Sequence, residues 1–187
     1  KIEQNLVLSS WKDSFSSSRT PQRLMEYIQV PEFGCFKDEK KRMFNTDASP
    51  VMNKIWSIGG KTGWYYGNIL WRIRGFMDKL VGGVGLRRGR TNNTTIDAGD
   101  ALDFWRVLVA DKKAMRLLLY AEMKLPGEAW LEFQITPVED NFELKQTATF
   151  RPKGVWGRLY WYGSWPFHYF IFNGMINKLS KGKEDKN

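Results

Sequence analysis

The stretch MRLLLYAEMKLPGEAWLEFQIT, residues 115–136, carries two runs of alternating apolar and polar side chains around a proline–glycine pair. This alternation is typical of β-strands, and the short connection predicts an antiparallel hairpin. A two-residue turn at Pro126-Gly127 would mix polar and apolar side chains on both faces. Burial therefore favours an odd loop length, which moves the side chains of one strand to the opposite face. In that register one face carries Leu117, Leu119, Ala121, Met123, Ala129, Leu131, Phe133 and Ile135. The other face carries Tyr120, Glu122, Trp130 and Glu132.

The next predicted strand, residues 142–151, extends this register across a short connection. Among its five inner side chains only Gln146 is polar, the others being Phe142, Leu144, Ala148 and Phe150. A buried amide needs hydrogen-bond partners, so Gln146 either anchors a ligand in a pocket or bonds to a neighbouring group. Further strands are predicted at residues 37–44, 84–90 and 102–109, the first of them as a charged edge strand. The strands together predict an antiparallel meander.

Two helices are predicted between the first strand and this meander. Ser49 followed by Pro50 has the chemistry of a helix start, and Gly59-Gly60 supplies the stop, which gives a short helix at residues 51–58. Residues 66–80 form the second helix, because apolar side chains recur three and four positions apart and so create a face that needs a partner. That face consists of Tyr66, Ile69, Leu70, Ile73, Phe76, Met77 and Leu80.

The C-terminal segment, residues 155–179, has helical length and is apolar almost all round, with Pro166 forcing a kink or a break. Between Arg158 and Lys178 there is no Lys, Arg, Asp or Glu, so a helix in or on a membrane is one alternative. Polar residues within the segment, and the apolar faces of the other elements, favour a helix buried against the sheet. The fold class is therefore α+β, a curled antiparallel sheet wrapped on a long C-terminal helix, with two short helices inserted after the first strand.

Length and composition fit one domain, since the chain has 187 residues and 42% of them are hydrophobic. We expect this domain at residues 31–180, a linker-like segment at residues 1–30 and a disordered basic tail at residues 181–187. Cys35 is the only cysteine, which excludes an intrachain disulfide and favours a cytoplasmic location. The first residues lack the basic and apolar regions of a signal peptide.

Positive charge is concentrated in one segment of the chain. The net charge is +9, and residues 72–90 contribute +5 of it. Such a segment is either a solvated surface or a patch for an anionic ligand, a phospholipid surface or nucleic acid, and nucleic acid is the least favoured of these partners. Arg88 and Arg90 are the candidates for binding an anionic end of a ligand.

Glycine motifs for nucleotide binding fail on their spacing. Gly59-Gly60-Lys61-Thr62 lacks the first glycine of a phosphate loop, because Ile55 occupies that position. Gly83-Val84-Gly85 lacks the third glycine of a dinucleotide fingerprint, which would fall on Arg88. The sequence therefore predicts no cofactor site in this chain. A single histidine and a single cysteine also exclude a His/Cys zinc cluster.

No catalytic residue is assigned from the sequence. His168 is the weak candidate for acid or base chemistry, although a histidine on an aromatic helix is more often a hydrogen-bonded pocket or core residue. A Cys-His nucleophile pair would require Cys35 to meet His168 from a distant strand. Glu122 and Glu132 resemble a carboxylate pair, but the register places them on the outer face, which favours cross-strand contacts.

Five motifs carry a resemblance to a known family: IWSIGGKTGWYY (55–66), GGVGLRRGR (82–90), GDALDFWRV (99–107), AEMKLPG (121–127) and GRLYWY (157–162). They resemble an uncharacterised C-terminal domain of YbjT-like, NAD(P)-binding short-chain dehydrogenase-related proteins. This resemblance implies a START-like helix-grip (SRPBCC) fold. It also implies an N-terminal Rossmann-like domain that binds NAD(P) and is absent from this chain, with residues 2–15 similar to the stretch that joins the two.

The leading hypothesis for function is a non-catalytic module that binds a hydrophobic small molecule, or caps a substrate, beside the Rossmann-like domain. The candidate ligand-binding residues are Trp105, Met123, Phe133, Gln146, Tyr162 and His168. One alternative is a helix-grip enzyme, similar to cyclases and hydrolases, that uses His168 or a pocket carboxylate. Another is a peripheral membrane protein whose aromatic helix enters the interface while the basic segment meets anionic lipids.

Overall fold

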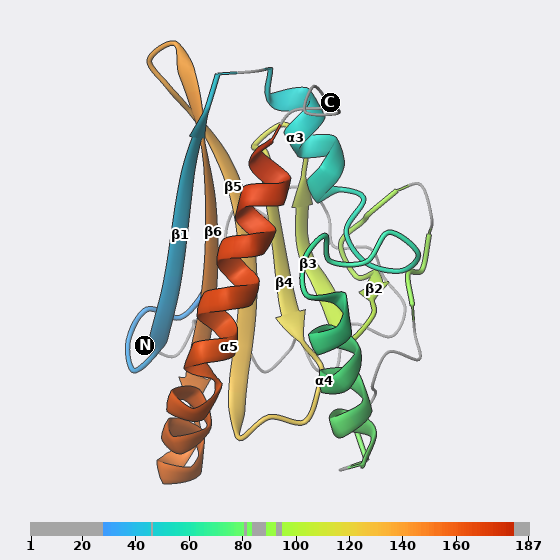
Figure 1. Cartoon of the computed structure of the whole chain (residues 1–187), viewed down its shortest axis with the longest axis vertical. Coiled ribbons are helices and arrows are strands. Elements are labelled where there is room, and N and C mark those ends of the chain that lie inside the picture. Colours follow the sequence, from blue (N-terminus) through green and yellow to red (C-terminus); the bar gives the residue numbers. More distant parts are fainter. Residues whose placement is uncertain (1–27, 46, 81, 84–88, 93–94, 182–187) are drawn as a thin grey trace.

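The computed structural model of the chain describes residues 28–45, 47–80, 82–83, 89–92 and 95–181. Most of the expected linker, almost all of the expected tail, and residues 84–88 of the expected strand at 84–90 lie outside these ranges, as does Arg88. The described residues form one antiparallel sheet with three helices on one face (Figure 1). The α+β, helix-grip architecture predicted from the sequence is confirmed.

The sheet has six strands in the order β1-β6-β5-β4-β3-β2, so each strand from β2 to β6 lies beside the next one in sequence. β1 closes the far edge by pairing with β6, as expected for a charged edge strand. The strand bounds are β1 Phe36–Phe44, β2 Ala101–Leu102, β3 Trp105–Asp111, β4 Arg116–Ala121, β5 Gly127–Val138 and β6 Asn141–Pro152.

The register of the central hairpin agrees with the one chosen on burial. Leu117 lies opposite Phe133, and Tyr120 lies opposite Trp130. The inner face is apolar, whereas the outer face combines polar side chains with the buried Leu118 and Trp130. Phe133 in turn lies opposite Gln146, which places Gln146 on the inner face. The odd loop length is therefore confirmed, and alternation was sufficient to predict which side chains share a face.

One predicted strand is instead a tight hairpin. Residues 102–109 were expected to run straight, but the chain reverses between β2 and β3. Asp103 turns the chain with a φ of +57°, a conformation that aspartate tolerates better than most residues. Its carboxylate accepts a hydrogen bond of 2.9 Å from the indole nitrogen of Trp64. This buried contact holds the reversal in place.

The first described helix, α3 (Ala48–Ile55), begins and ends about one turn earlier than predicted. Its N-cap is Asp47, whose carboxylate accepts a hydrogen bond from the backbone nitrogen of Ser49. The helix start predicted at Ser49 is therefore wrong, because an equally good cap, aspartate, lies two residues earlier. The last turn ends at Trp56, and the next residues form a turn that leads to the bridge between Gly59 and Gly63.

The second helix, α4 (Asn68–Leu80), buries a different face from the predicted one. Trp71, Gly75 and Asp78 are buried, and the indole of Trp71 packs against Trp64 and Phe104. The Asp78 carboxylate accepts a hydrogen bond of 2.7 Å from the backbone nitrogen of Lys124. The apolar residues expected to face the core are largely exposed instead, namely Ile69, Ile73, Phe76, Met77 and Leu80.

The long helix α5 (Gly154–Ser180) crosses the same face of the sheet and continues through Pro166 without a break. Its second half buries one side against the sheet, where Met175, Ile176 and Leu179 are inaccessible to solvent. Its first half exposes most of its apolar side chains, so the expectation of a helix buried all round is wrong there. Within the described residues, no helix combines the length and the apolar character that crossing a membrane requires.

Candidate functional site

A cavity of about 420 Å³ lies between α4, the inner face of the sheet and the first half of α5. Figure 1 shows α4 and the first turns of α5 at the same end of the sheet. The helices contribute Leu70, Trp71, Ile73, Arg74 and Met77 from α4, and Tyr160, Trp161, Ser164, Phe167, His168, Ile171 and Phe172 from α5. The sheet and its loops contribute Trp105, Met123, Leu125, Ala129, Ala148 and Phe150.

The cavity has a buried base and an exposed mouth. Trp71, Trp105 and Phe172 are each less than a tenth exposed and form the base. Met77 and Phe167 also line the cavity but are 55% and 57% exposed, one on each helix. The mouth therefore opens between α4 and α5. A ligand would enter past apolar side chains and reach a floor of aromatic rings.

Aromatic contacts explain why the base keeps its shape. Trp64 lies 5.1 Å from Trp71 and 6.0 Å from Trp105, measured between ring centroids, and Phe104 contacts both of the latter rings. The ring of Trp64 is buried, and its indole nitrogen donates a hydrogen bond to the Asp103 carboxylate. The indole nitrogens of Trp71 and Trp105 have no hydrogen-bond partner among the described residues.

His168 lies on the α5 side of the cavity, between the rings of Trp161 and Phe172 at centroid distances of 5.2 and 5.1 Å. Burial lowers the pKa of His168 from 6.5 to about 4, with the nearby Asp38 opposing this change and Arg74 adding to it. The side chain is therefore neutral at pH 7. Its Nδ1 atom has no hydrogen-bond partner among the described residues.

Of the six residues predicted to bind a ligand, Trp105, Met123 and His168 line the cavity. Phe133 does not line the cavity, because it is inaccessible to solvent within the hydrophobic core. Tyr162 does not line the cavity and is 65% exposed, with its ring in a T-shaped contact with Phe36. The periodicity of a helix places positions 161 and 168 on one side, and position 162 on the next.

Gln146 is 1% exposed on the inner face, as the register predicts, but it does not line the cavity. Its amide nitrogen and oxygen have no hydrogen-bond partner among the described residues. Gln146 therefore matches neither alternative considered from the sequence, since it neither lines the cavity nor forms a hydrogen bond with a described neighbour. The amide lies beside Phe133 on β5 and Lys40 on β1.

Arg90, expected to bind an anion, donates hydrogen bonds to backbone carbonyl groups instead. Its guanidinium contacts the oxygens of Trp56, Ile58, Asn92 and Thr95 at 2.6–3.2 Å. These bonds fix the loop that precedes β2 against the end of α3. Arg90 does not line the cavity.

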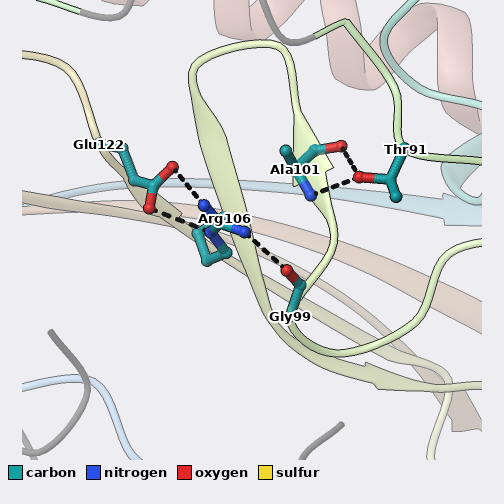
Figure 2. Close-up of polar contacts among 5 residues, drawn as sticks. All are labelled: Thr91, Gly99, Ala101, Arg106 and Glu122. Atoms are coloured by element: carbon teal, nitrogen blue, oxygen red, sulfur yellow. Dashed lines mark hydrogen bonds and ion pairs between the residues drawn. The ribbon is translucent and has the colours of Figure 1, made fainter. Parts of the chain in front are cut away.

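The carboxylates on the outer face are engaged in cross-strand ion pairs, as the register predicts. Figure 2 shows Glu122 bound by Arg106 through two nitrogen–oxygen contacts of 3.0 and 3.1 Å, while Arg106 also donates to the carbonyl of Gly99. Glu132 pairs with Arg116 at 2.6 Å. In the described part of the chain, no three His, Cys, Asp or Glu side chains are grouped so that they could hold a metal ion.

Arg74 is the site residue that the sequence reasoning missed. It lies on the face of α4 that carries Trp71 and Asp78, and its side chain lines the cavity. In the sequence it was counted only as one of several charges in a basic segment. The usable signal is its spacing, three residues after Trp71 and four before Asp78, but that signal depends on knowing which face is buried.

Comparison with protein families identifies one family model that covers most of the chain. The model of a family described as "Protein of unknown function (DUF2867)" matches residues 35–175. No curated protein sequence matches the chain. Solved structures are similar at low identity, and the helix-grip fold stated above rests on the strand order and helices of this chain itself.

Three of these structures illustrate the level of similarity. Norcoclaurine synthase from Thalictrum flavum is 7% identical, with a TM-score of 0.48 over 78% of this chain and 84% of that one. A protein from Thermobifida fusca is 14% identical, with a TM-score of 0.43 over 79% and 91%. A protein from Nitrosospira multiformis is 11% identical, with a TM-score of 0.42 over 77% and 93%.

Proposed function

The chain belongs to the DUF2867 family of proteins of unknown function, and we propose that it is a module that binds a hydrophobic small molecule between its sheet and its C-terminal helix. The observation that carries this proposal is the cavity of about 420 Å³, with a base of aromatic rings and a mouth between α4 and α5. Its volume falls within the range of about 300–1,000 Å³ that is usual for small-molecule sites. Burial of a ligand's apolar surface against these rings would supply the affinity.

We also propose that the module works beside an NAD(P)-binding Rossmann-like domain of a YbjT-like, dehydrogenase-related protein in the cytoplasm, as a binding or substrate-capping partner. The support is the resemblance of the five motifs and the failed spacing of both glycine motifs in this chain. The test is the coding sequence upstream of Lys1. A strand, a G-x-G-x-x-G turn and a helix in the same reading frame are expected there, and an unrelated upstream sequence would reject this part of the proposal.

Gly163 offers a way to close the cavity without disturbing the fold. It lies on α5 at the cavity wall, and a Cβ atom added there meets nothing within 4 Å. We expect Gly163→Trp to weaken binding of the neutral fluorescent probe N-phenyl-1-naphthylamine by at least about tenfold, since an indole would occupy ligand space. The measurement is a fluorescence titration of the purified chain.

Gly163→Ala is the matched control, because it makes the same backbone change without filling the cavity. It should leave probe binding unchanged and raise the free energy of unfolding by up to about 1 kcal/mol, the usual gain in helix propensity. Equal probe affinity in the Trp variant and the Ala variant would reject the cavity as the binding site. Absence of probe binding by the original chain would reject the proposed function itself.

A second candidate function is contact with an anionic membrane, favoured by the surface around the mouth. We define the rim surface as the exposed apolar side chains of the two helices: Ile69, Ile73, Phe76, Met77 and Leu80 of α4, and Val155, Trp156, Leu159, Tyr162, Trp165, Phe167, Tyr169 and Phe170 of α5. The exposed charges on these helices are all basic, at Arg72, Lys79, Arg158 and Lys178. Apolar and aromatic side chains flanked by positive charge match the interface of an anionic bilayer.

This candidate predicts that the chain floats with vesicles that contain phosphatidylserine and remains at the bottom with neutral vesicles. Phe76→Glu combined with Trp156→Glu should abolish flotation, because two carboxylates would enter the rim surface. Val138→Glu is the control, since Val138 is also exposed but lies at the β5–β6 turn, at the opposite end of those strands from the start of α5. If the original chain does not float, the hypothesis of membrane contact is rejected. A protein partner would then be the remaining explanation for the rim surface.

A further inference from the structure

Arg74 is a charged group placed in the wall of an apolar cavity. The side chain projects from the buried face of α4 and is half-buried. Among the described residues that line the cavity, Arg74 is the only Lys, Arg, Asp or Glu. A guanidinium keeps its charge under all ordinary conditions, so this wall carries one fixed positive charge.

The contacts of Arg74 are with groups that do not neutralise it. Its Nε and Nη2 atoms both lie 3.3 Å from the thioether sulfur of Met123, which is a weak acceptor. Its Cζ atom lies 5.1 Å from the centre of the Tyr160 ring. It forms no ion pair with any described residue, in contrast to Arg106 and Arg116 on the outer face.

This arrangement has an energetic consequence for what the cavity takes up. A charge in apolar surroundings is costly unless it is paired and hydrogen-bonded. The two nitrogens that now contact Met123 form the same guanidinium edge that binds a carboxylate through two parallel hydrogen bonds. If a ligand carboxylate took the place of the Met123 thioether, two charge-assisted hydrogen bonds would replace two weak contacts. This wall of the cavity therefore strongly favours an anionic group.

We propose that Arg74 binds the carboxylate of an apolar monocarboxylic acid, whose hydrocarbon part lies in the cavity against Trp105, Phe150 and Phe172. This inference rests on the proposed function and names the ligand class for the same site. One arginine balances one negative charge. A phosphate monoester carries about two at neutral pH and would remain partly uncompensated in this apolar wall.

The decisive experiment compares two probes that differ only in charge, cis-parinaric acid and its methyl ester, in fluorescence titrations at pH 7.5. We expect the original chain to bind the acid at least about tenfold more tightly than the ester, as charge-assisted hydrogen bonds imply. Arg74→Met should remove this preference by lowering the affinity for the acid, while the affinity for the ester changes less than about twofold. Arg74→Lys keeps the charge but loses the two-pronged geometry, so its preference should be intermediate.

Arg72→Met is the matched control, because Arg72 lies on the same helix, is exposed and does not line the cavity. It should keep the full preference for the acid, which separates a local contact from the general positive charge. Equal binding of acid and ester by the original chain would overturn the assignment of Arg74, and so would a preference that survives in Arg74→Met. In both cases ester binding would leave the proposed function standing, whereas binding of neither probe would reject the function itself.

Discussion

Phe133→Ala should lower the free energy of unfolding by about 3–5 kcal/mol, the usual cost of removing a fully buried phenylalanine ring. Phe133 is inaccessible to solvent and lies on β5 between Leu117 of β4 and Gln146 of β6. Because both neighbours are held in strands, the space left by the ring cannot close easily. The measurement is denaturant unfolding, in which the midpoint should fall while the slope of the transition stays constant.

Phe167→Ala is the matched control for this prediction, since Phe167 is 57% exposed at the mouth of the cavity. Its removal should change the free energy of unfolding by no more than about 0.5 kcal/mol. The two variants should also differ in their effect on ligand binding, because only Phe167 touches the cavity. A cost below about 1 kcal/mol for Phe133→Ala would contradict the tight packing of this core.

The central sheet could be predicted from the sequence because its information is local. In residues 115–136 the alternation has a period of two, and a shift of one residue would expose Leu117, Leu119 and Phe133 together. Registers shifted by an odd number of residues are therefore incompatible with burial. The same logic extended to β6 and correctly placed Gln146 on the inner face.

The orientation of α4 could not be predicted because its determinants are distant in the sequence. Periodicity favoured the face with Ile69, Phe76 and Leu80, which is the more apolar one. The helix instead buries Trp71 against Phe104, and Asp78 against the backbone of Lys124. A buried hydrogen bond and a ring cluster outweigh an apolar stripe, but neither partner can be identified from a helical pattern.

The candidate site inherits this difficulty. His168 was recognisable as a cavity residue because the aromatic helix was predicted correctly. Trp105 was recognisable as well, although its strand was predicted without the reversal at Asp103. Arg74 was not recognisable, because its role depends on the face that α4 buries. The same rotation of α4 exposes the α4 part of the rim surface, so one unpredicted feature accounts for both the charged anchor and one side of the mouth.

Acid should destabilise the protein through His168, and replacement of this histidine should remove that effect. Burial lowers the pKa of His168 to about 4 in the folded chain, against 6.5 for an exposed histidine. Between these two values the unfolded chain binds a proton that the folded chain does not, so stability falls as the pH decreases from 6.5 to about 4. Below that range the folded chain is protonated as well, and this contribution becomes constant.

Between pH 7 and pH 4, this effect of His168 should lower the free energy of unfolding by on the order of 3 kcal/mol. His168→Phe keeps a ring between Trp161 and Phe172 but cannot take up a proton, so it isolates the contribution of this one group. Carboxylates also take up protons in acid, but they do so in both chains. The informative quantity is therefore the difference in free energy of unfolding between the original chain and the variant, measured at pH 7, 6, 5 and 4. That difference should shift steadily in favour of the variant as the pH falls, and parallel profiles would show that His168 is not buried in the way its ring contacts require.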